Sequence, residues 1–249
     1  MNTILLQPTD VLFFRDGRPM EGALSGHGAS WPLPTVTDAA IHAALHRSEL
    51  ESHTHHHDSK RGGDPKRKYG SLTHTGPFPV SPSDDWYFPR PSDLQANSSI
   101  PSVFPLAPKQ LASNWSCPQE LVYPCVNRLA ASKEALPPKW ITRSAFEHYV
   151  HGEPSPLCGQ SDGDIFSAEH QVGIEIDPIS GTTGYGDTKG KIYSAHYLRM
   201  REGWRMGIIA STSEKKGDDR VDLLPMLLGK DNNICVGGQQ RICTAICNP

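Results

Sequence analysis

The sequence lacks the segments that would place it in a membrane or mark it for export. No apolar run approaches the roughly 18 residues that a membrane span requires. Residues 1–10 lack a basic segment followed by an apolar one, and no cysteine pair has the Cys-x-x-Cys spacing of a zinc ribbon. We therefore expect a cytoplasmic protein with reduced cysteines and with neither metal nor cofactor. The alternative is a metal site at Cys235, Cys243 and Cys247.

Recognisable catalytic motifs are also missing. The sequence has no Gly-x-Ser-x-Gly turn, no His-Glu-x-x-His helix and no Gly-x-x-x-x-Gly-Lys-Ser/Thr phosphate loop. His27 lies between two glycines, where it is either a general base or an inert loop residue. His42 and His46 lie one helical turn apart, which fits a metal pair or two solvated side chains. We expect no catalytic residue.

Charge and composition narrow the fold and the class of partner. The 22 glycines and 22 prolines favour a loop-rich α/β or mostly β protein over a helical bundle. The net charge of −3 excludes a uniformly basic surface. A role in nucleic-acid binding would therefore need local basic patches.

One such patch follows the first apolar segment of the chain. Val11 to Phe14 has the composition of a short buried strand, and Arg15, Asp16, Gly17 and Arg18 follow it as a turn. A strand that ends in a glycine turn with two arginines can hold a phosphate backbone, because arginine donates two parallel hydrogen bonds to phosphate oxygens. The alternative is a hairpin turn with solvated arginines.

The same order of strand, glycines and arginine returns near residue 240. Val236 precedes Gly237 and Gly238, and Arg241 follows two glutamines. Glycines let a backbone approach a ligand closely and expose its N–H groups. Residues 51–69 form an insert with almost no apolar side chains, which contains four histidines and the cluster Lys66, Arg67 and Lys68. This insert is either a solvated tract or a further contact for phosphates.

Periodicity predicts a set of strands and short helices around these segments. We expect a strand at 4–6 and a helix at 35–46, capped by Thr35 or Thr37, with Ala40, Ile41, Ala44 and Leu45 on its apolar face. Further along the chain we expect helices at 132–140, 142–150 and 223–228, the last ended by Gly229, and strands at 169–177, 191–200 and 204–210, with 201–203 joining two of them as a hairpin. The last element, 232–241, begins as a strand and continues through the paired glycines to Arg241.

Six blocks of the sequence, in order, resemble a known family. They are residues 12–20, 32–45, 76–78, 86–94, 172–193 and 236–241. Together they are similar to the third Cmr protein family, a subunit of type III-B CRISPR effector complexes in the RAMP superfamily. The resemblance implies an α+β fold of two ferredoxin-like, RRM-related units. On that basis we expect a ferredoxin-like unit over 1–95, an irregular partner-facing region over 96–165, and a strand-rich second unit over 166–249.

The resemblance also implies a function in antiviral defence. Members of the family hold the 5′ tag of the guide RNA, dock the large polymerase-like subunit and a backbone subunit, and do not cut RNA. Our candidate RNA-binding residues are therefore Arg15, Asp16, Gly17, Arg18, His27, Lys66, Arg67, Lys68, Gly237, Gly238 and Arg241.

Three features depart from the family pattern. Gln239 stands where the RAMP glycine signature usually has glutamate, which should change a local contact more than the backbone. The sequence stops at Pro249, soon after that signature, so we expect the second unit to be incomplete. The histidine-rich insert has no counterpart in the family.

Two other functions stay open at this point. A RAMP-type guide-processing endoribonuclease would use a histidine near the first helix, and His27, His42 and His46 are available. A protein-only scaffold is compatible with the low net charge and the irregular middle region.

Overall fold

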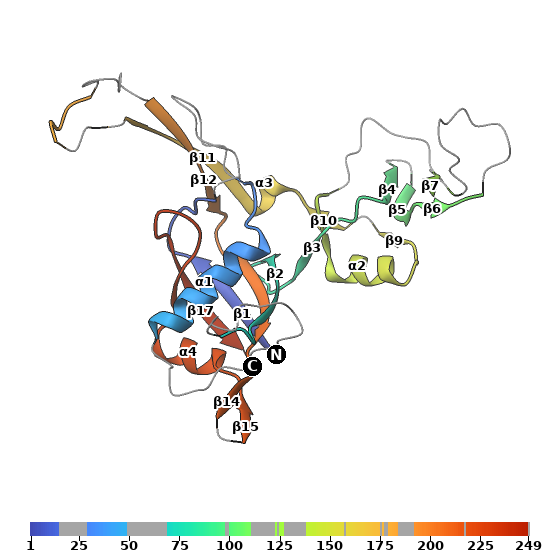
Figure 1. Ribbon diagram of the computed structural model, residues 1–249. Coiled ribbons are helices and arrows are strands. Elements are labelled where there is room, and N and C mark those ends of the chain that lie inside the picture. Colours follow the sequence, from blue (N-terminus) through green and yellow to red (C-terminus); the bar gives the residue numbers. More distant parts are fainter. Residues whose placement is uncertain are drawn as a thin grey trace. The chain divides into compact units, whose positions relative to one another are not determined.

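The structure is a computed structural model that describes residues 1–14, 29–48, 69–97, 100–110, 123, 125–126, 138–156, 158–174, 176, 179–183, 192–216 and 218–248. The chain divides into two compact units. The first consists of Met1–Pro82 and Phe166–Pro249, and the second of Ser83–Ile165. Each unit has its own strands and helices (Figure 1).

A five-stranded antiparallel sheet is the base of the first unit. Its spatial order is β16 (Asn233–Cys235), β17 (Ile242–Asn248), β1 (Asn2–Pro8), β13 (Arg205–Ser211) and β2 (Thr73–Val80). Leu6 on β1 lies opposite Met206 on one side and Ala245 on the other. The predicted strand at 4–6 is confirmed, and it is the centre of the sheet.

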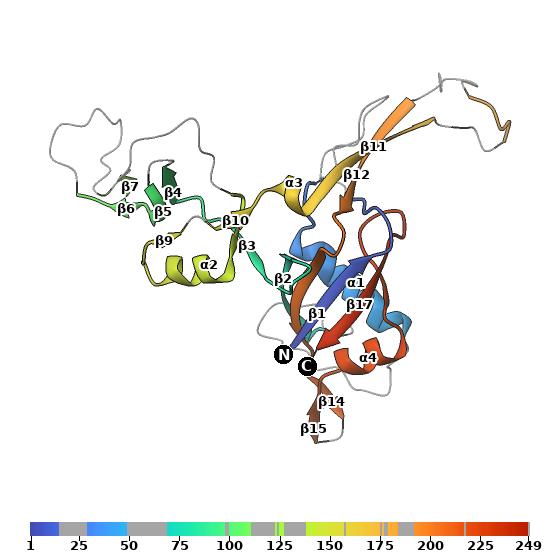
Figure 2. The same ribbon diagram turned by 180° about the vertical axis from the view of Figure 1, so that it is seen from behind.

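Two helices cover one face of this sheet. Helix α1 (Pro34–Arg47) lies in front of the strands in Figure 1 and behind them in Figure 2, where α4 (Leu224–Lys230) lies beside it. The predicted apolar face of α1 is confirmed, because all four of its residues are buried. None of the helices within the described ranges is long and apolar enough to span a membrane.

The ends of these helices differ from the prediction. Neither Thr35 nor Thr37 caps α1: the N-cap is Leu33, which makes no side-chain cap bond, and Pro34 occupies the first turn. Proline has the helical φ built in and lacks the N–H that a cap would satisfy, so the helix can begin there without a side-chain acceptor. Helix α4 continues through Gly229 because its α-helical hydrogen bonds extend to Asp231.

The elements that build the sheet come from both ends of the sequence. Along the chain they follow as β1, α1, β2, β13, α4 and β17, with the short β16 added at the edge. The predicted division into 1–95, 96–165 and 166–249 differs from the compact units, because β1 pairs with both β13 and β17. Strand β17 was not predicted, although Ile242, Thr244 and Ile246 are β-branched residues at alternate positions, a pattern typical of strands.

A long hairpin of β11 (Phe166–Ile174) and β12 (Ile192–Met200) extends from this unit. The predicted strand at 169–177 is present over most of its length, but its alternating apolar residues, Val172 and Ile174, are 71% and 52% exposed. The predicted hairpin through 201–203 is wrong. Residues 201–204 form a turn, yet β12 pairs with β11 whereas β13 joins the five-stranded sheet. A small hairpin of β14 (Glu214–Lys216) and β15 (Asp219–Val221) completes the unit.

The second unit has a small core of its own. Leu94, Ile141 and Ala145 are buried, with Phe146 and Tyr149 packed against them. Its strands are β3 (Tyr87–Pro89), β4 (Leu94–Asn97), β5 (Ile100–Pro105), β6 (Ala107–Pro108), β7 (Cys125–Val126), β8 (Trp140–Thr142), β9 (Ser155–Pro156) and β10 (Gly159–Gln160).

Its helices are α2 (Arg143–Val150) and α3 (Asp162–Ile165). The helix predicted at 142–150 is confirmed, and the Thr142 hydroxyl caps it by accepting a hydrogen bond from the Ala145 amide. The helix predicted at 132–140 is wrong for residues 138–140, because Trp140 pairs in β8 with Pro89.

Candidate nucleic-acid interface

The glycine loop, residues 236–241, joins β16 to β17 and closes on itself. The Val236 amide donates to the Arg241 carbonyl at 2.8 Å. Gly237, Gln239 and Gln240 have φ values of 77°, 60° and 52°, in the left-handed region. Glycine adopts that region without strain, whereas glutamine does so less readily.

This loop lies directly on the segment Val11 to Phe14. The Gly238 amide donates to the Phe13 carbonyl at 2.8 Å. A Cβ at Gly237 would lie 2.5 Å from the same carbonyl oxygen, and one at Gly238 would lie 2.8 Å from the Phe13 ring. The two glycines are therefore required for close backbone packing against Phe13.

In the segment Val11 to Phe14, Val11, Leu12 and Phe14 are buried as predicted and Phe13 is half-buried, although as a strand the segment forms only one isolated bridge, between Leu12 and Leu198. The Phe14 carbonyl accepts a hydrogen bond from the Ala29 amide at 2.9 Å, so the backbones of these two residues lie side by side. Phe13 and Phe14 therefore lie against a loop that follows more than 200 residues later in the sequence.

Most of the candidate residues lie outside the described part of the chain. This holds for Arg15, Asp16, Gly17, Arg18, His27, Lys66, Arg67 and Lys68. Of the candidates, the structure places Gly237, Gly238 and Arg241 together in one loop.

An open pocket of about 530 Å³ lies beside the glycine loop. It is lined by Phe13, Phe14, Thr35, Val36, Ala39, Ala40, Ala43, Cys235, Gly237 and Gly238. The pocket therefore lies between Phe13 and Phe14, the glycine loop and the first turns of α1. Its lining is mostly apolar, with small side chains on the helix, so it suits a flat uncharged group better than a phosphate.

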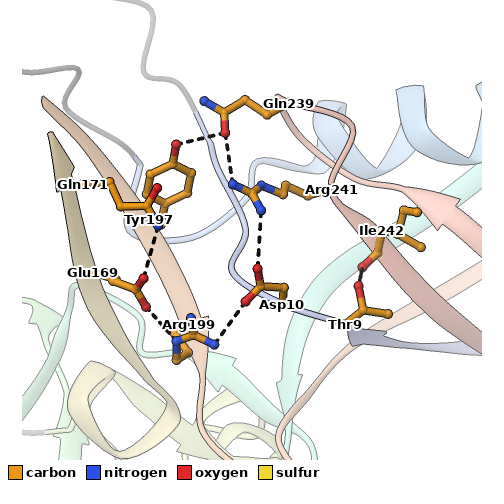
Figure 3. Close-up of polar contacts among 9 residues, drawn as sticks. All are labelled: Thr9, Asp10, Glu169, Gln171, Tyr197, Arg199, Gln239, Arg241 and Ile242. Atoms are coloured by element: carbon orange, nitrogen blue, oxygen red, sulfur yellow. Dashed lines mark hydrogen bonds and ion pairs between the residues drawn. The ribbon is translucent and has the colours of Figure 1, made fainter. Parts of the chain in front are cut away.

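Arg241 is held by contacts within the protein (Figure 3). Its guanidinium donates to the Gln239 side-chain oxygen at 3.2 Å and to Asp10 at 3.4 Å, and lies 5.1 Å from the centre of the Tyr197 ring. The Tyr197 hydroxyl donates to the same Gln239 oxygen at 2.9 Å. The Gln239 side chain, at the position of the departure, therefore makes contacts with both Tyr197 and Arg241.

Asp10 connects Arg241 to a second arginine. One oxygen of Asp10 lies 3.4 Å from Arg241 and the other 3.2 Å from Arg199 on β12, and Arg199 also donates to Glu169 on β11 at 2.7 Å (Figure 3). The sequence reasoning missed Asp10, Glu169 and Arg199. The one feature of the sequence that could have indicated Arg199 is its spacing of two residues from Tyr197, which puts both side chains on one face of a strand.

A sequence profile of the family described as CRISPR-associated protein (Cas_Cmr3) matches residues 4–244. The chain belongs to the Cas_Cmr3 family. The resemblance seen in the six ordered blocks is therefore confirmed. No curated protein matches this Cas_Cmr3 chain.

Among solved structures, two cryo-EM structures of the type III-B Cmr-beta complex contain a similar chain. One complex is bound to cognate target RNA and AMPPnP, in state 1, and the other to cognate target RNA. Their TM-scores are 0.45 and 0.44, each at 13% identity, and each match covers 98% of this Cas_Cmr3 chain. The chain spans 62% of the length of those relatives.

The histidines of α1 make contacts within this Cas_Cmr3 protein. His42 lies 3.8 Å from the Asp38 carboxylate, and His74 of β2 lies 3.6 Å from the same group. The His46 ring packs edge-on against the Tyr69 ring, with centres 5.1 Å apart. These contacts give both helix histidines a structural role.

Cys243 and Cys247 on β17 favour the thiol form. Burial raises the pKa of Cys243 to about 12, and the pKa of Cys247 is also raised, mainly by burial. The thiolate is the form that binds metals. Within the described ranges no three histidine, cysteine or acidic side chains are grouped as a metal site would need.

The two carboxylates beside Arg199 make the first unit sensitive to acid. The Val11 amide and then Arg199 and Arg241 lower the pKa of Asp10, and the hydrogen bond from Arg199 lowers the pKa of Glu169. A lowered pKa in the folded state means that the stabilisation is present above the unfolded pKa of about 4 and is lost as the pH falls.

We therefore expect the melting temperature to fall more steeply below about pH 4 in the wild-type protein than in the double variant Asp10→Asn, Glu169→Gln. Thermal melts at a series of pH values measure this difference. Parallel curves for the two proteins would contradict it.

Proposed function

We propose that this chain is a non-catalytic, RNA-binding subunit of a type III-B CRISPR ribonucleoprotein, and that it holds the 5′ tag of the guide RNA. Family membership supports the assembly. The observation that carries the RNA site is the packing of the glycine loop on Phe13, because it joins the Arg241 bend to the start of the Arg15 bend. Arginines that neighbouring backbone segments bring to one place suit a ribose-phosphate chain.

The arrangement of the first unit supports the proposed fold. A chain order of strand, helix, strand, strand, helix, strand with β17, β1, β13 and β2 side by side is the pattern of a ferredoxin-like unit. We propose one such unit here, built from both ends of the sequence, in place of the first of the two units expected from the resemblance.

In the proposed site, Arg15, Arg18 and Arg241 contact tag phosphates, and Gly237 and Gly238 contribute by packing the loop that carries Arg241 closely on Phe13. The proposed site also includes Lys66, Arg67 and Lys68 of the insert, which add positive charge for the RNA. The remaining residues proposed to contact the RNA are Asp16, Gly17 and His27.

The proposed function also includes contacts with two protein subunits. We propose that the chain docks a large polymerase-like subunit and a backbone subunit, and that residues 96–165 face them. The exposed apolar side chains of Val172, Ile174 and Ile176 on and beyond β11 support a protein contact at the long hairpin as well.

The test is the double variant Arg15→Ala, Arg18→Ala in the assembled complex. Loss of two charged hydrogen-bonding groups should weaken guide-RNA binding about 10- to 100-fold. The slope of log affinity against log salt should become shallower by about 1.4, since each phosphate contact on a single strand contributes about 0.7. Filter binding of labelled guide RNA at several salt concentrations measures both quantities.

The matched control is Lys215→Ala, Arg220→Ala. These residues pair across the β14–β15 hairpin, at the other end of the sheet from the glycine loop (Figure 1). The control should leave both affinity and slope unchanged. Equal effects of the two double variants would refute the site, and site-specific cleavage of repeat RNA by the lone chain, without metal, would refute the non-catalytic assignment. Recovery of the assembled subunits without RNA would favour a protein-only scaffold.

A further inference from the structure

The carboxylate of Asp10 lies between two guanidinium groups. Its two oxygens face two guanidinium groups, Arg199 at 3.2 Å and Arg241 at 3.4 Å (Figure 3). A phosphodiester also offers two oxygens, and guanidinium groups bind phosphate and carboxylate with the same donor geometry. The pair of arginines is therefore an anion site, and an anion from the protein itself fills it.

The two arginines hold Asp10 only loosely, and the other partner of its side chain is the Val11 amide. Charge-assisted contacts to a carboxylate are typically about 2.7–2.9 Å long, and both contacts of Asp10 exceed that range. The contact between Arg199 and Glu169, at 2.7 Å, falls within it. The Asp10 side chain is also 55% exposed, so water and ions reach it from outside. An exposed ion pair of this kind is easily exchanged.

Both arginines keep other contacts if Asp10 leaves. Arg199 retains Glu169, and Arg241 retains the Gln239 oxygen and the Tyr197 ring. The Nε atom of Arg241 is buried and has no hydrogen-bond partner among the described residues, so the resting contacts do not satisfy this guanidinium completely. The two arginines therefore keep their positions through these other contacts when the Asp10 side chain moves away.

We propose that Arg199 and Arg241 form a binding site for one RNA phosphodiester and that Asp10 is its resting occupant, which the phosphate displaces. This inference rests on the proposed RNA-binding function and adds Arg199 and Asp10 to the site. The four charged side chains, Asp10, Glu169, Arg199 and Arg241, sum to zero. Displacement therefore exchanges one anion for another, and this contact adds little to the salt dependence of wild-type binding.

The test is Asp10→Asn in the assembled complex. Asparagine keeps the oxygen that accepts from the Val11 amide but removes the competing charge. Guide-RNA affinity at low salt should rise about two- to fivefold, the range expected when an exposed ion pair no longer competes. The salt slope should steepen by about 0.7, because one phosphate is then neutralised without release of a carboxylate.

Glu169→Gln is the matched control. It makes the same change of net charge beside Arg199 but leaves Asp10 between the two arginines, so it should give less than half of the gain. Adding Arg199→Ala to Asp10→Asn should abolish the gain. Thermal melts of each variant check that the first unit stays folded.

Equal gains for Asp10→Asn and Glu169→Gln would overturn the inference in favour of a general charge effect. An unchanged or weaker affinity for Asp10→Asn would overturn it in favour of a purely structural ion pair. If Arg15→Ala, Arg18→Ala loses guide RNA while Asp10→Asn has no effect, the proposed function stands and this inference fails. If the wild-type assembly retains no guide RNA, both fail.

Discussion

Replacement of Gly237 by alanine is expected to lower the free energy of unfolding of the first unit by about 2–5 kcal/mol. The φ of 77° costs an alanine about 1–2 kcal/mol. The added Cβ would also lie 2.5 Å from the Phe13 carbonyl oxygen, which is backbone and cannot rotate away. The loop must therefore lift from Phe13 or the segment Val11 to Phe14 must shift, and a strained position of this kind adds about 1–3 kcal/mol. Denaturant unfolding measures the loss.

The matched control is the same substitution at Gly229 in α4. No atom lies within 4 Å of a Cβ built there, and the residue is helical. Alanine is a better helix former than glycine, so Gly229→Ala should be neutral or stabilise by up to about 1 kcal/mol. If Gly237→Ala were as stable as this control, the packing of the glycine loop on Phe13 would be wrong, and with it the proposed union of the two bends.

Replacement of Ile208 by alanine is expected to destabilise the first unit by about 2–5 kcal/mol. Ile208 is completely buried on β13, opposite Ile4 on β1, on the side that the helices cover. Truncation there removes buried apolar surface and leaves a cavity in a close-packed core. Thermal and denaturant unfolding of the purified variant give the magnitude.

Ile246→Ala on the neighbouring strand β17 is the control for this prediction. Ile246 lies opposite Leu5, one residue from Ile4 and hence on the other face of the sheet, and it is 47% exposed. Its loss should cost under about 1 kcal/mol. A result in which both isoleucines cost the same would contradict a sheet covered by helices on one face only.

Local patterns in the sequence were sufficient to predict elements that depend on residues close together in the sequence. Helix α1 was predicted from residues three and four apart, and the burial of Val11 to Phe14 from composition alone. Pairing was harder, because it depends on residues far away in the sequence. Val11 to Phe14 forms one bridge to Leu198 in place of a full strand, and β1 finds β17 more than 200 residues later.

The candidate site also contains some residues that local sequence identifies and others that it does not. The glycines of residues 236–241 were identified from the sequence, and the structure gives the reason, which is close backbone packing. Arg241 was identified only as a cation. Its partner Asp10 is 231 residues away, and no local pattern links the two. Short motifs indicate which side chains carry chemistry, whereas the tertiary fold decides which charges oppose one another.

The central position of β1 has a consequence for synthesis of the protein. Strand β1 leaves the ribosome early, but its neighbours β13 and β17 follow only after Ser83–Ile165 has been made. Until then both edges of β1 are unpaired, and unpaired strand edges favour association with other chains. The contiguous unit Ser83–Ile165 is free to fold first on the nascent chain. The sheet that carries the glycine loop therefore assembles after the unit Ser83–Ile165. Until it does, the unpaired edges of β1 are a binding surface for chaperones that hold unfolded chains.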